Sequence, residues 1–263
     1  MKILGKPFLS LLLLLLCFES KAQLLDFSHE IGAFVGPVAF QSDFGERHNF
    51  PTNAGNTGFG IGLVHYMNFS YTAGCPSCKK TYTFWNDHFK IRSEFSYNST
   101  KLDHFGQWVD DSKTSEFAKQ LRAMHGVAKV TDLGMQLEYY PMSIRDFESY
   151  EPRYAPFVAI GAHYTWFQNG TYSDIGPMNT YLSTPTKYMN AWSDTGGNTW
   201  SVVSSVGSRY KLNDMSDVFV ELRWQYYFSD WVDGLKPNPE VYTENKANDW
   251  NLWLNFGYIY YLD

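Results

Sequence analysis

Cysteine, charge and long apolar runs are all scarce in this 263-residue chain, and each scarcity excludes a class of protein. Only 3 residues are cysteine, and Cys75 and Cys78 form the one close pair, so a four-cysteine zinc site is excluded. Charged residues make up 18% of the chain, below the roughly 25% of ordinary globular domains. The net charge of −6 argues against nucleic acid as a partner.

The one long apolar run lies at the N-terminus and is too short to span a bilayer. Lys2 and Lys6 flank its start, and Ser20-Lys21-Ala22 gives the small-x-small pattern of a cleavage site. A spanning helix needs about 20 residues. We therefore interpret residues 1–22 as a removed signal peptide and 23–263 as one exported domain. Lipid attachment at Cys17 is the less favoured alternative, because Leu16 occupies the place of the usual small residue.

Aromatic residues are abundant, at 18% of the chain, and they recur in segments that alternate between apolar and polar residues. Such alternation predicts β-strands with one apolar face. We predict eight strands, at about 29–40, 57–71, 88–97, 127–140, 155–167, 200–212, 218–228 and 250–262. In the last segment, every second residue from Trp250 to Leu262 is aromatic or leucine. Its length matches the roughly 9–11 residues of a tilted membrane-spanning strand.

An even number of strands suits antiparallel closure, and the connectors fit the same topology. Long polar connectors follow the first, third, fifth and seventh strands, whereas those after the fourth and sixth are shorter. Long outer loops and short periplasmic turns are typical of outer-membrane barrels. The connector at 72–87 is an exception because it is long for a turn. We predict an all-β, eight-stranded antiparallel transmembrane barrel with long extracellular loops, in the outer membrane of a Gram-negative bacterium.

The polar faces of the predicted strands carry both acids and bases. An eight-stranded barrel is just wide enough for side chains to fill it, and buried charges must be paired. We therefore predict an ion-paired interior without a pore, and a gated proton or ion path is the alternative. The network comprises Glu30, Lys90, Arg92, Glu94, Asp132, Glu138, Arg209, Glu221 and Arg223.

The pair Cys75 and Cys78 leaves three interpretations open. A local disulfide is favoured in an oxidising envelope. Metal binding would need two further ligands, and a redox centre would need a strand-to-helix setting that this segment lacks. Gly58, Gly60 and Gly62 precede no helix, so they are not a nucleotide-binding motif. We interpret them as small inward residues that let the opposite wall approach.

Scattered histidines, at positions 65, 104, 125 and 163, form no motif that fixes a catalytic triad. We therefore predict no catalytic residues, no metal and no cofactor. The connector at 168–199 holds aromatic residues among small polar ones, a composition suited to protein or glycan contact. Its candidate contact residues are Tyr172, Tyr181, Tyr188 and Trp192, and the alternative is a loop packed on itself.

Two segments resemble a known group of proteins. Residues 28–36, SHEIGAFVG, and 129–140, KVTDLGMQLEYY, resemble the small eight-stranded outer-membrane proteins of Bacteroidota, among them the PorG-like accessory barrels of type IX secretion. The resemblance implies a non-enzymatic subunit that contacts outer-membrane lipid and docks other outer-membrane or periplasmic proteins, in the secretion machinery or the β-barrel assembly machinery. A free-standing barrel with surface ligand binding or lipid-modifying activity is the alternative.

Overall fold

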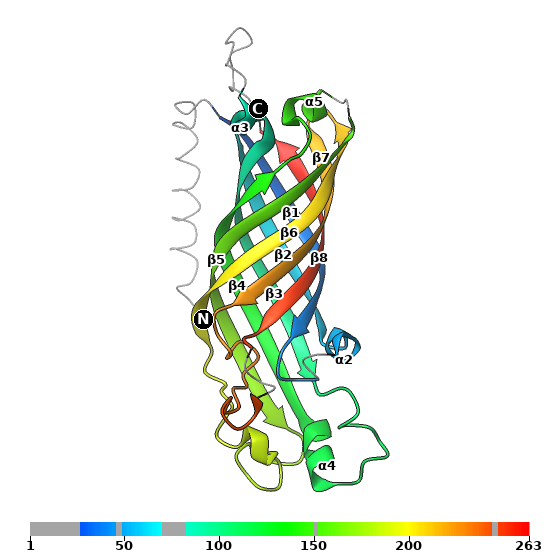
Figure 1. Ribbon diagram of the computed structural model, residues 1–263, viewed down its shortest axis with the longest axis vertical. Coiled ribbons are helices and arrows are strands. Elements are labelled where there is room, and N and C mark those ends of the chain that lie inside the picture. Colours follow the sequence, from blue (N-terminus) through cyan, green and yellow to red (C-terminus); the bar gives the residue numbers. More distant parts are fainter. Residues whose placement is uncertain (1–26, 46–48, 70–82, 150–151, 244–246, 263) are drawn as a thin grey trace, which may run out of the picture.

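The computed structural model describes residues 27–45, 49–69, 83–149, 152–243 and 247–262. In that part of the chain, eight antiparallel strands form one closed barrel, and each strand pairs with its neighbours in sequence (Figure 1). The barrel closes between the first and last strands, where Ile31 lies opposite Tyr260 and Ala39 lies opposite Leu252. The predicted fold class is confirmed. The proposed signal peptide and Cys75-Pro76-Ser77-Cys78 lie outside the described residues.

All eight predicted segments form strands, and the third and the fifth extend well beyond their predicted ends. The bounds are β1 Ser28–Gln41, β2 Thr57–Asn68, β3 Phe89–Asp103, β4 Met124–Tyr139, β5 Tyr154–Ser173, β6 Gly197–Asn213, β7 Ser216–Tyr227 and β8 Trp250–Tyr261. The additional residues of β3 and β5 include exposed polar side chains on the outer face, such as Lys101 and Gln168. The alternation of apolar and polar residues therefore stops before the hydrogen-bonded strand ends.

The helices are short and lie at the two ends of the barrel. Their bounds are α2 Phe50–Ala54, α3 Phe84–His88, α4 Glu116–Ala123, α5 Ile144–Glu148 and the 3₁₀-helix η2 Thr186–Tyr188. Figure 1 places α3 and α5 at the end where β8 finishes, and α2 and α4 at the opposite end. Within the described part of the chain, no helix has both the length and the apolar character required to cross a bilayer.

The two ends of the barrel differ in the length of their connectors. The segments 42–56, 104–123, 174–196 and 228–249 join strands at the end that holds α2 and α4. At the other end, β6 and β7 are joined by a tight turn at 214–215, and β4 and β5 by a connector at 140–153 that contains α5. The connector at 69–88, between β2 and β3, is longer than the other two. Because outer-membrane barrels have long outer loops and short periplasmic turns, the α2 and α4 end is extracellular and the α3 and α5 end is periplasmic.

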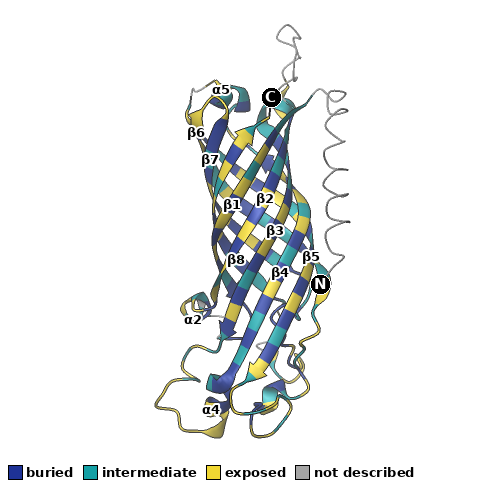
Figure 2. Cartoon of the chain, turned by 180° about the vertical axis from the view of Figure 1, so that it is seen from behind, coloured by how far each residue is buried: buried dark blue, intermediate teal, exposed yellow. Residues whose placement is uncertain are grey.

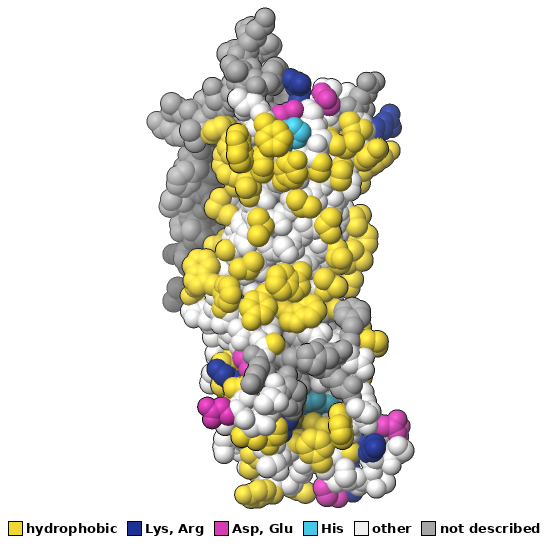
Figure 3. Space-filling model, viewed as in Figure 1, with side chains coloured by type: hydrophobic (Ala, Val, Ile, Leu, Met, Phe, Trp, Pro, Cys, Tyr) yellow, Lys and Arg dark blue, Asp and Glu magenta, His cyan; other side chains and the backbone are white. Residues whose placement is uncertain are grey.

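The outer wall of the barrel is apolar between these ends. Outward side chains in the middle of the strands are large and exposed, such as Leu63 at 60%, Ile160 at 62% and Phe256 at 49%. Figure 3 shows hydrophobic side chains over the barrel wall, with the coloured charged side chains confined to the two ends of this face. A wall of this kind needs hydrocarbon around it. The protein is therefore a transmembrane β-barrel of the outer membrane of Gram-negative bacteria.

Pro37 lies inside β1, where proline removes a hydrogen-bond donor. The β1–β2 register continues through Pro37, which lies opposite Phe59. On the β8 side, pairing stops at Val35 and resumes at Val38 in the same register. The chain therefore accommodates the proline by leaving two residues unpaired on one side, without a bulge and without ending the strand.

The inward glycines of β2 make room for aromatic rings from nearby strands. A Cβ atom on Gly62 would lie 2.3 Å from Phe34 of β1, and one on Gly60 would lie 2.2 Å from Trp253 of β8. We expected these glycines to admit the opposite wall, and that expectation was wrong. Phe34 and Trp253 belong to β1 and β8, which lie on the same side of the barrel as β2, so the glycines make room for side chains of nearby strands and not for the opposite wall.

Candidate functional site

Charged side chains on the inward faces of the strands lie together in the lumen of the barrel. Figure 2 shows how buried and exposed residues alternate along each strand. The structure places all nine residues of the predicted network inside, each with at most 2% of its surface exposed: Glu30, Lys90, Arg92, Glu94, Asp132, Glu138, Arg209, Glu221 and Arg223. Eight of the nine take part in ion pairs with each other, and Asp132 does not.

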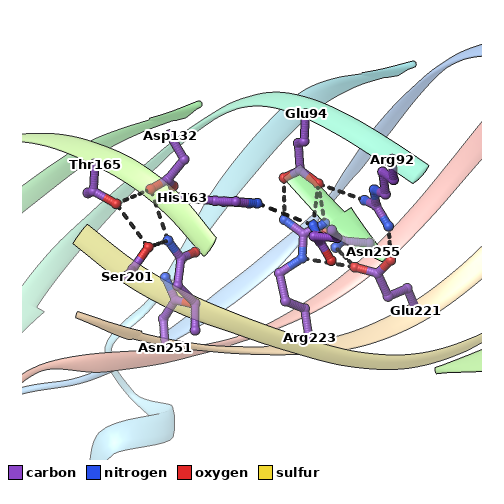
Figure 4. A network of polar contacts seen from close by, with 12 residues as sticks. Arg92, Glu94, Asp132, His163, Thr165, Ser201, Glu221, Arg223, Asn251 and Asn255 are labelled. Carbon is purple, nitrogen blue, oxygen red and sulfur yellow. Dashed lines mark hydrogen bonds and ion pairs between the residues drawn. The ribbon is translucent and has the colours of Figure 1, made fainter. Parts of the chain in front are cut away.

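Two arginines and two glutamates form the centre of this network (Figure 4). Arg223 Nη1 and Nη2 lie 2.5 and 2.8 Å from Glu94 Oε1 and Oε2. Arg223 Nε also donates to Glu221 Oε1 at 2.9 Å. Arg92 contacts Glu94 at 2.9 Å and also pairs with Glu221. Each charge is thus matched by at least one opposite charge, as burial in a low-dielectric interior requires.

A second group lies nearer the periplasmic end. Glu30 accepts hydrogen bonds from Lys90 at 2.5 Å and from Arg209 at 2.6 Å. Arg209 Nη2 also lies 3.6 Å from Glu138, which accepts a hydrogen bond from the Tyr140 hydroxyl. The sequence analysis did not select Lys211 and Asp217, which are buried here 3.8 Å apart. Both are on the polar face, and they lie at the β6–β7 turn where alternation was weak.

Asp132 is held by neutral groups. It accepts hydrogen bonds from Thr165 Oγ1 at 2.5 Å and from Gln225 Nε2 at 2.9 Å. Ser201 completes the cluster, 3.0 Å from Thr165 and 2.9 Å from Gln225 (Figure 4). The register places Thr165 directly opposite Asp132 in the β4–β5 ladder. Asp132 therefore lies among neutral polar side chains, beyond the ion-paired centre of the lumen.

Aromatic rings pack around the arginines inside the barrel. The guanidinium of Arg209 lies 4.1 Å from the centre of the Tyr66 ring, and that of Arg223 lies 5.0 Å from Phe34. Such contacts desolvate the cation while keeping it attracted to the ring. Sequence reasoning missed this group. A signal was present, because Phe34 interrupts the small and polar inward face of β1 and lies opposite Gly62.

The periplasmic end of the lumen is covered by the connector that contains α5. Phe147 is buried, and it packs in one cluster with Tyr140, Ile144 and Phe157. Glu148 accepts a hydrogen bond from Asn68 Nδ2 at 2.6 Å and lies 3.3 Å from Lys90 Nζ. Burial raises the pKa of Glu148 above its ordinary value, although Lys90 opposes the rise. The connector therefore joins the interior network at this end.

The extracellular loops fold over the other end of the lumen. Phe44, Tyr188, Val232 and Leu235 come from three different loops and are all buried in one cluster. His104 lies against this cluster, 4.7 Å from Phe44 between ring centres, and burial together with Lys187 lowers its pKa to about 3.

A buried acid also joins these loops. Asp233 accepts hydrogen bonds from the backbone N–H groups of Asp43 and Leu235 at 2.8 and 2.7 Å. Burial and the neighbouring carboxylate of Asp43 hold the pKa of Asp233 above its usual range. The hydrogen bond from the Asp43 N–H therefore ties the β1–β2 loop to the β7–β8 loop.

The four predicted contact residues of the 168–199 segment divide into two pairs. Tyr172 and Tyr181 are exposed, at 52% and 88%. Tyr188 is buried and donates to the carbonyl of Asp43 at 3.2 Å, while Trp192 forms an isolated bridge with Leu235. The segment thus packs against two other extracellular loops at Tyr188 and Trp192, and burial removes Tyr188 from the contact surface.

The four histidines occupy separate places. His163 lies inside the barrel, His104 lies under the loops, and His65 is hydrogen-bonded to His29 at 3.0 Å. His125 lies between two acids, 2.5 Å from Asp103 and 3.1 Å from Asp174. Among the described residues, no group of three or more histidine, cysteine, aspartate or glutamate side chains is arranged to hold a metal ion.

Comparisons with known proteins find similarity in architecture alone. No protein-family model matches the sequence, and no curated protein matches it. The attachment invasion locus protein Ail of Yersinia pestis is 9% identical, with 90% of this chain and 100% of Ail covered and a TM-score of 0.40. A major outer membrane protein of Thermus thermophilus is 13% identical, with 89% and 99% covered and a TM-score of 0.46. OprG of Pseudomonas aeruginosa is 14% identical, with 89% and 96% covered and a TM-score of 0.37.

Proposed function

We propose that this barrel is a non-enzymatic accessory subunit of a larger envelope protein complex, of the kind that PorG-like barrels serve in type IX secretion or that assembles β-barrels. The proposal rests on how the extracellular loops present apolar side chains. Tyr181 and Leu182 are 88% and 67% exposed, and both lie beyond the membrane-embedded belt. Exposed apolar residues on an ordered loop favour a protein contact.

The loop that carries these residues is supported from beneath by α4. Gln120 Nε2 donates to the carbonyl of Tyr181 at 2.8 Å and lies 3.3 Å from that of Leu182. Phe117, on the same helix, is 40% exposed. A loop backbone that is held in place before binding loses less entropy when a partner arrives. The three residues Phe117, Tyr181 and Leu182 therefore form a candidate docking surface, which we call the α4 surface.

The filled lumen also favours a supporting role over transport. Charged side chains from opposite walls meet inside it, and folded loops cover both ends. Binding a partner at the outer surface requires no open channel through the barrel. Docking through the α4 surface would leave the ion pairs intact.

The test is gentle detergent extraction of the affinity-tagged chain from its native membrane, followed by identification of the chains that co-purify. We expect larger outer-membrane subunits to accompany the wild-type chain and to be lost from a Tyr181→Ser/Leu182→Ser variant. Val241→Ser is the matched control, because Val241 is 66% exposed on a different loop. A wild-type barrel that elutes as a monomer without partners would overturn the proposal.

A further inference from the structure

The extracellular edge of the membrane-embedded belt is marked by aromatic residues on β3 and β5. Tyr97 and Trp166 point outward and are 39% and 43% exposed. Thr131 of β4 lies between them, opposite Tyr97 in one ladder and opposite Trp166 in the other. Aromatic side chains at this position of a barrel mark the boundary between hydrocarbon and headgroups. The next outward residues on these strands therefore lie at the level of the lipid headgroups.

One lysine lies at that level and a second lies one outward position beyond it. Lys129 of β4 lies opposite Ser99 on β3 and opposite Gln168 on β5. Lys101 lies two residues beyond Ser99, so the two lysines are diagonal neighbours on adjacent strands. The Cα atoms of such neighbours are about 7–8 Å apart. Both lysines and Gln168 are exposed. Figure 2 shows β4 and β5 continuing toward the extracellular loops on this side.

Neither lysine has an acidic partner among the described residues, because the nearby acids are occupied elsewhere. Asp103 follows Lys101 on the same face, and its carboxylate lies 2.5 Å from His125 Nδ1. Asp174 lies 3.1 Å from the other ring nitrogen of His125. The two ammonium groups therefore remain available to an anion that approaches from the membrane side.

We propose that Lys101 and Lys129 bind a phosphate group on the headgroup of an outer-leaflet glycolipid. A phosphate carries enough oxygens to accept hydrogen bonds from two ammonium groups at once. Ser99 and Gln168 lie on either side of Lys129 and supply a hydroxyl and an amide as further donors. The acyl chains of the same lipid would lie against the apolar wall below Tyr97 and Trp166. The position at the headgroup level favours a lipid over a soluble anion.

The experiment measures binding of diphosphorylated lipid A to the purified full-length barrel in mild detergent, by native mass spectrometry with titration. A lysine near an anionic membrane surface contributes about fivefold to binding, so Lys101→Ala/Lys129→Ala should bind about thirtyfold more weakly. Added salt should weaken wild-type binding, and the arginine variant Lys101→Arg/Lys129→Arg should retain it. Heat-dependent mobility in gel electrophoresis verifies that each variant is folded.

The control is Lys113→Ala/Lys119→Ala, which removes the same charge from exposed positions of the β3–β4 loop. Equal loss of binding in this control would overturn the proposal, because general attraction would then explain the effect. Wild-type binding of fully dephosphorylated lipid A with unchanged affinity would overturn it as well. Full displacement of the lipid by low millimolar inorganic phosphate would show that the two lysines serve a soluble anion instead.

Discussion

Arg223 and Glu94 form a two-point ion pair across the lumen, with nitrogen to oxygen distances of 2.5 and 2.8 Å. They belong to β7 and β3, which are four strands apart in a closed barrel of eight and so form opposite walls. Paired hydrogen bonds between a guanidinium and a carboxylate fix direction as well as distance. This pair therefore fixes the separation of the two walls.

Breaking this pair from one side should be costly. Arg223→Leu removes a positive charge that pairs with the buried carboxylates of Glu94 and Glu221. We expect a loss of about 3–5 kcal/mol in the free energy of unfolding. The double variant Arg223→Leu/Glu94→Leu removes both charges and should recover part of that loss. Urea-induced unfolding from lipid vesicles measures all the variants. Additive effects of the two single substitutions would contradict a direct coupling between these residues.

A side chain at position 60 should conflict with Trp253. Gly60→Ala would place its Cβ 2.2 Å from the indole ring, and we expect a cost of about 1–3 kcal/mol from overpacking. Trp253→Leu in the same chain should relieve the conflict. The measurement is again the free energy of unfolding. Gly170→Ala serves as the control, because a Cβ there meets nothing within 4 Å.

The contribution of His104 to closure of the extracellular loops should be lost in acid. His104 has a pKa of about 3 in the folded loops, against about 6.5 in an exposed state, so the open state binds the proton more tightly. This contribution is therefore fully present above pH 6.5 and falls as the pH decreases, by about 2 kcal/mol at pH 5. Asp233, whose pKa is raised in the closed loops, contributes in the opposite direction. The His104 contribution is therefore measured by hydrogen exchange of residues 186–191 at pH 5 and pH 7, in the wild-type chain and in His104→Phe.

His104→Phe should remove the acid sensitivity, because phenylalanine retains the ring contact with Phe44 and carries no titrating group. Equal loss of protection in this variant and in the wild-type chain at pH 5 would assign the effect to other residues. Asp110→Asn is a suitable control, since Asp110 lies on the exposed part of the β3–β4 loop.

The aromatic residues of β8 should matter for assembly. Phe256, Tyr258 and Tyr260 are outward and 44–49% exposed, and they lie on the strand that closes the barrel. If this strand is the recognised element, replacing all three with alanine should reduce the assembled fraction more than Phe59→Ala/Ile61→Ala/Leu63→Ala on β2. Outer-membrane fractionation with heat-dependent mobility measures the assembled fraction. Normal insertion of the β8 variant would contradict a role in recognition.

The extracellular ends of β3 and β5 could not be predicted from the alternation of apolar and polar residues. Inside the membrane, the outer face must be apolar, so alternation defined the strands well. Beyond it, water faces the same wall, and Lys101 and Gln168 continue hydrogen-bonded strands without any apolar signal. The strands stay hydrogen-bonded beyond the point where the outer face is apolar and the inner face polar.

The sequence by itself determined the strand number, the outward apolar face and most of the inward charges, because these follow from a period of two and from the chemistry of lipid and water. Tertiary structure alone decided which charge meets which. Arg223 pairs with Glu94 on the opposite wall, Asp132 has only neutral partners, and Tyr188 lies under the loops although its loop composition suggested exposure. Barrel closure and loop packing set these distances, and the alternation of residues along one strand contains no information about the facing wall.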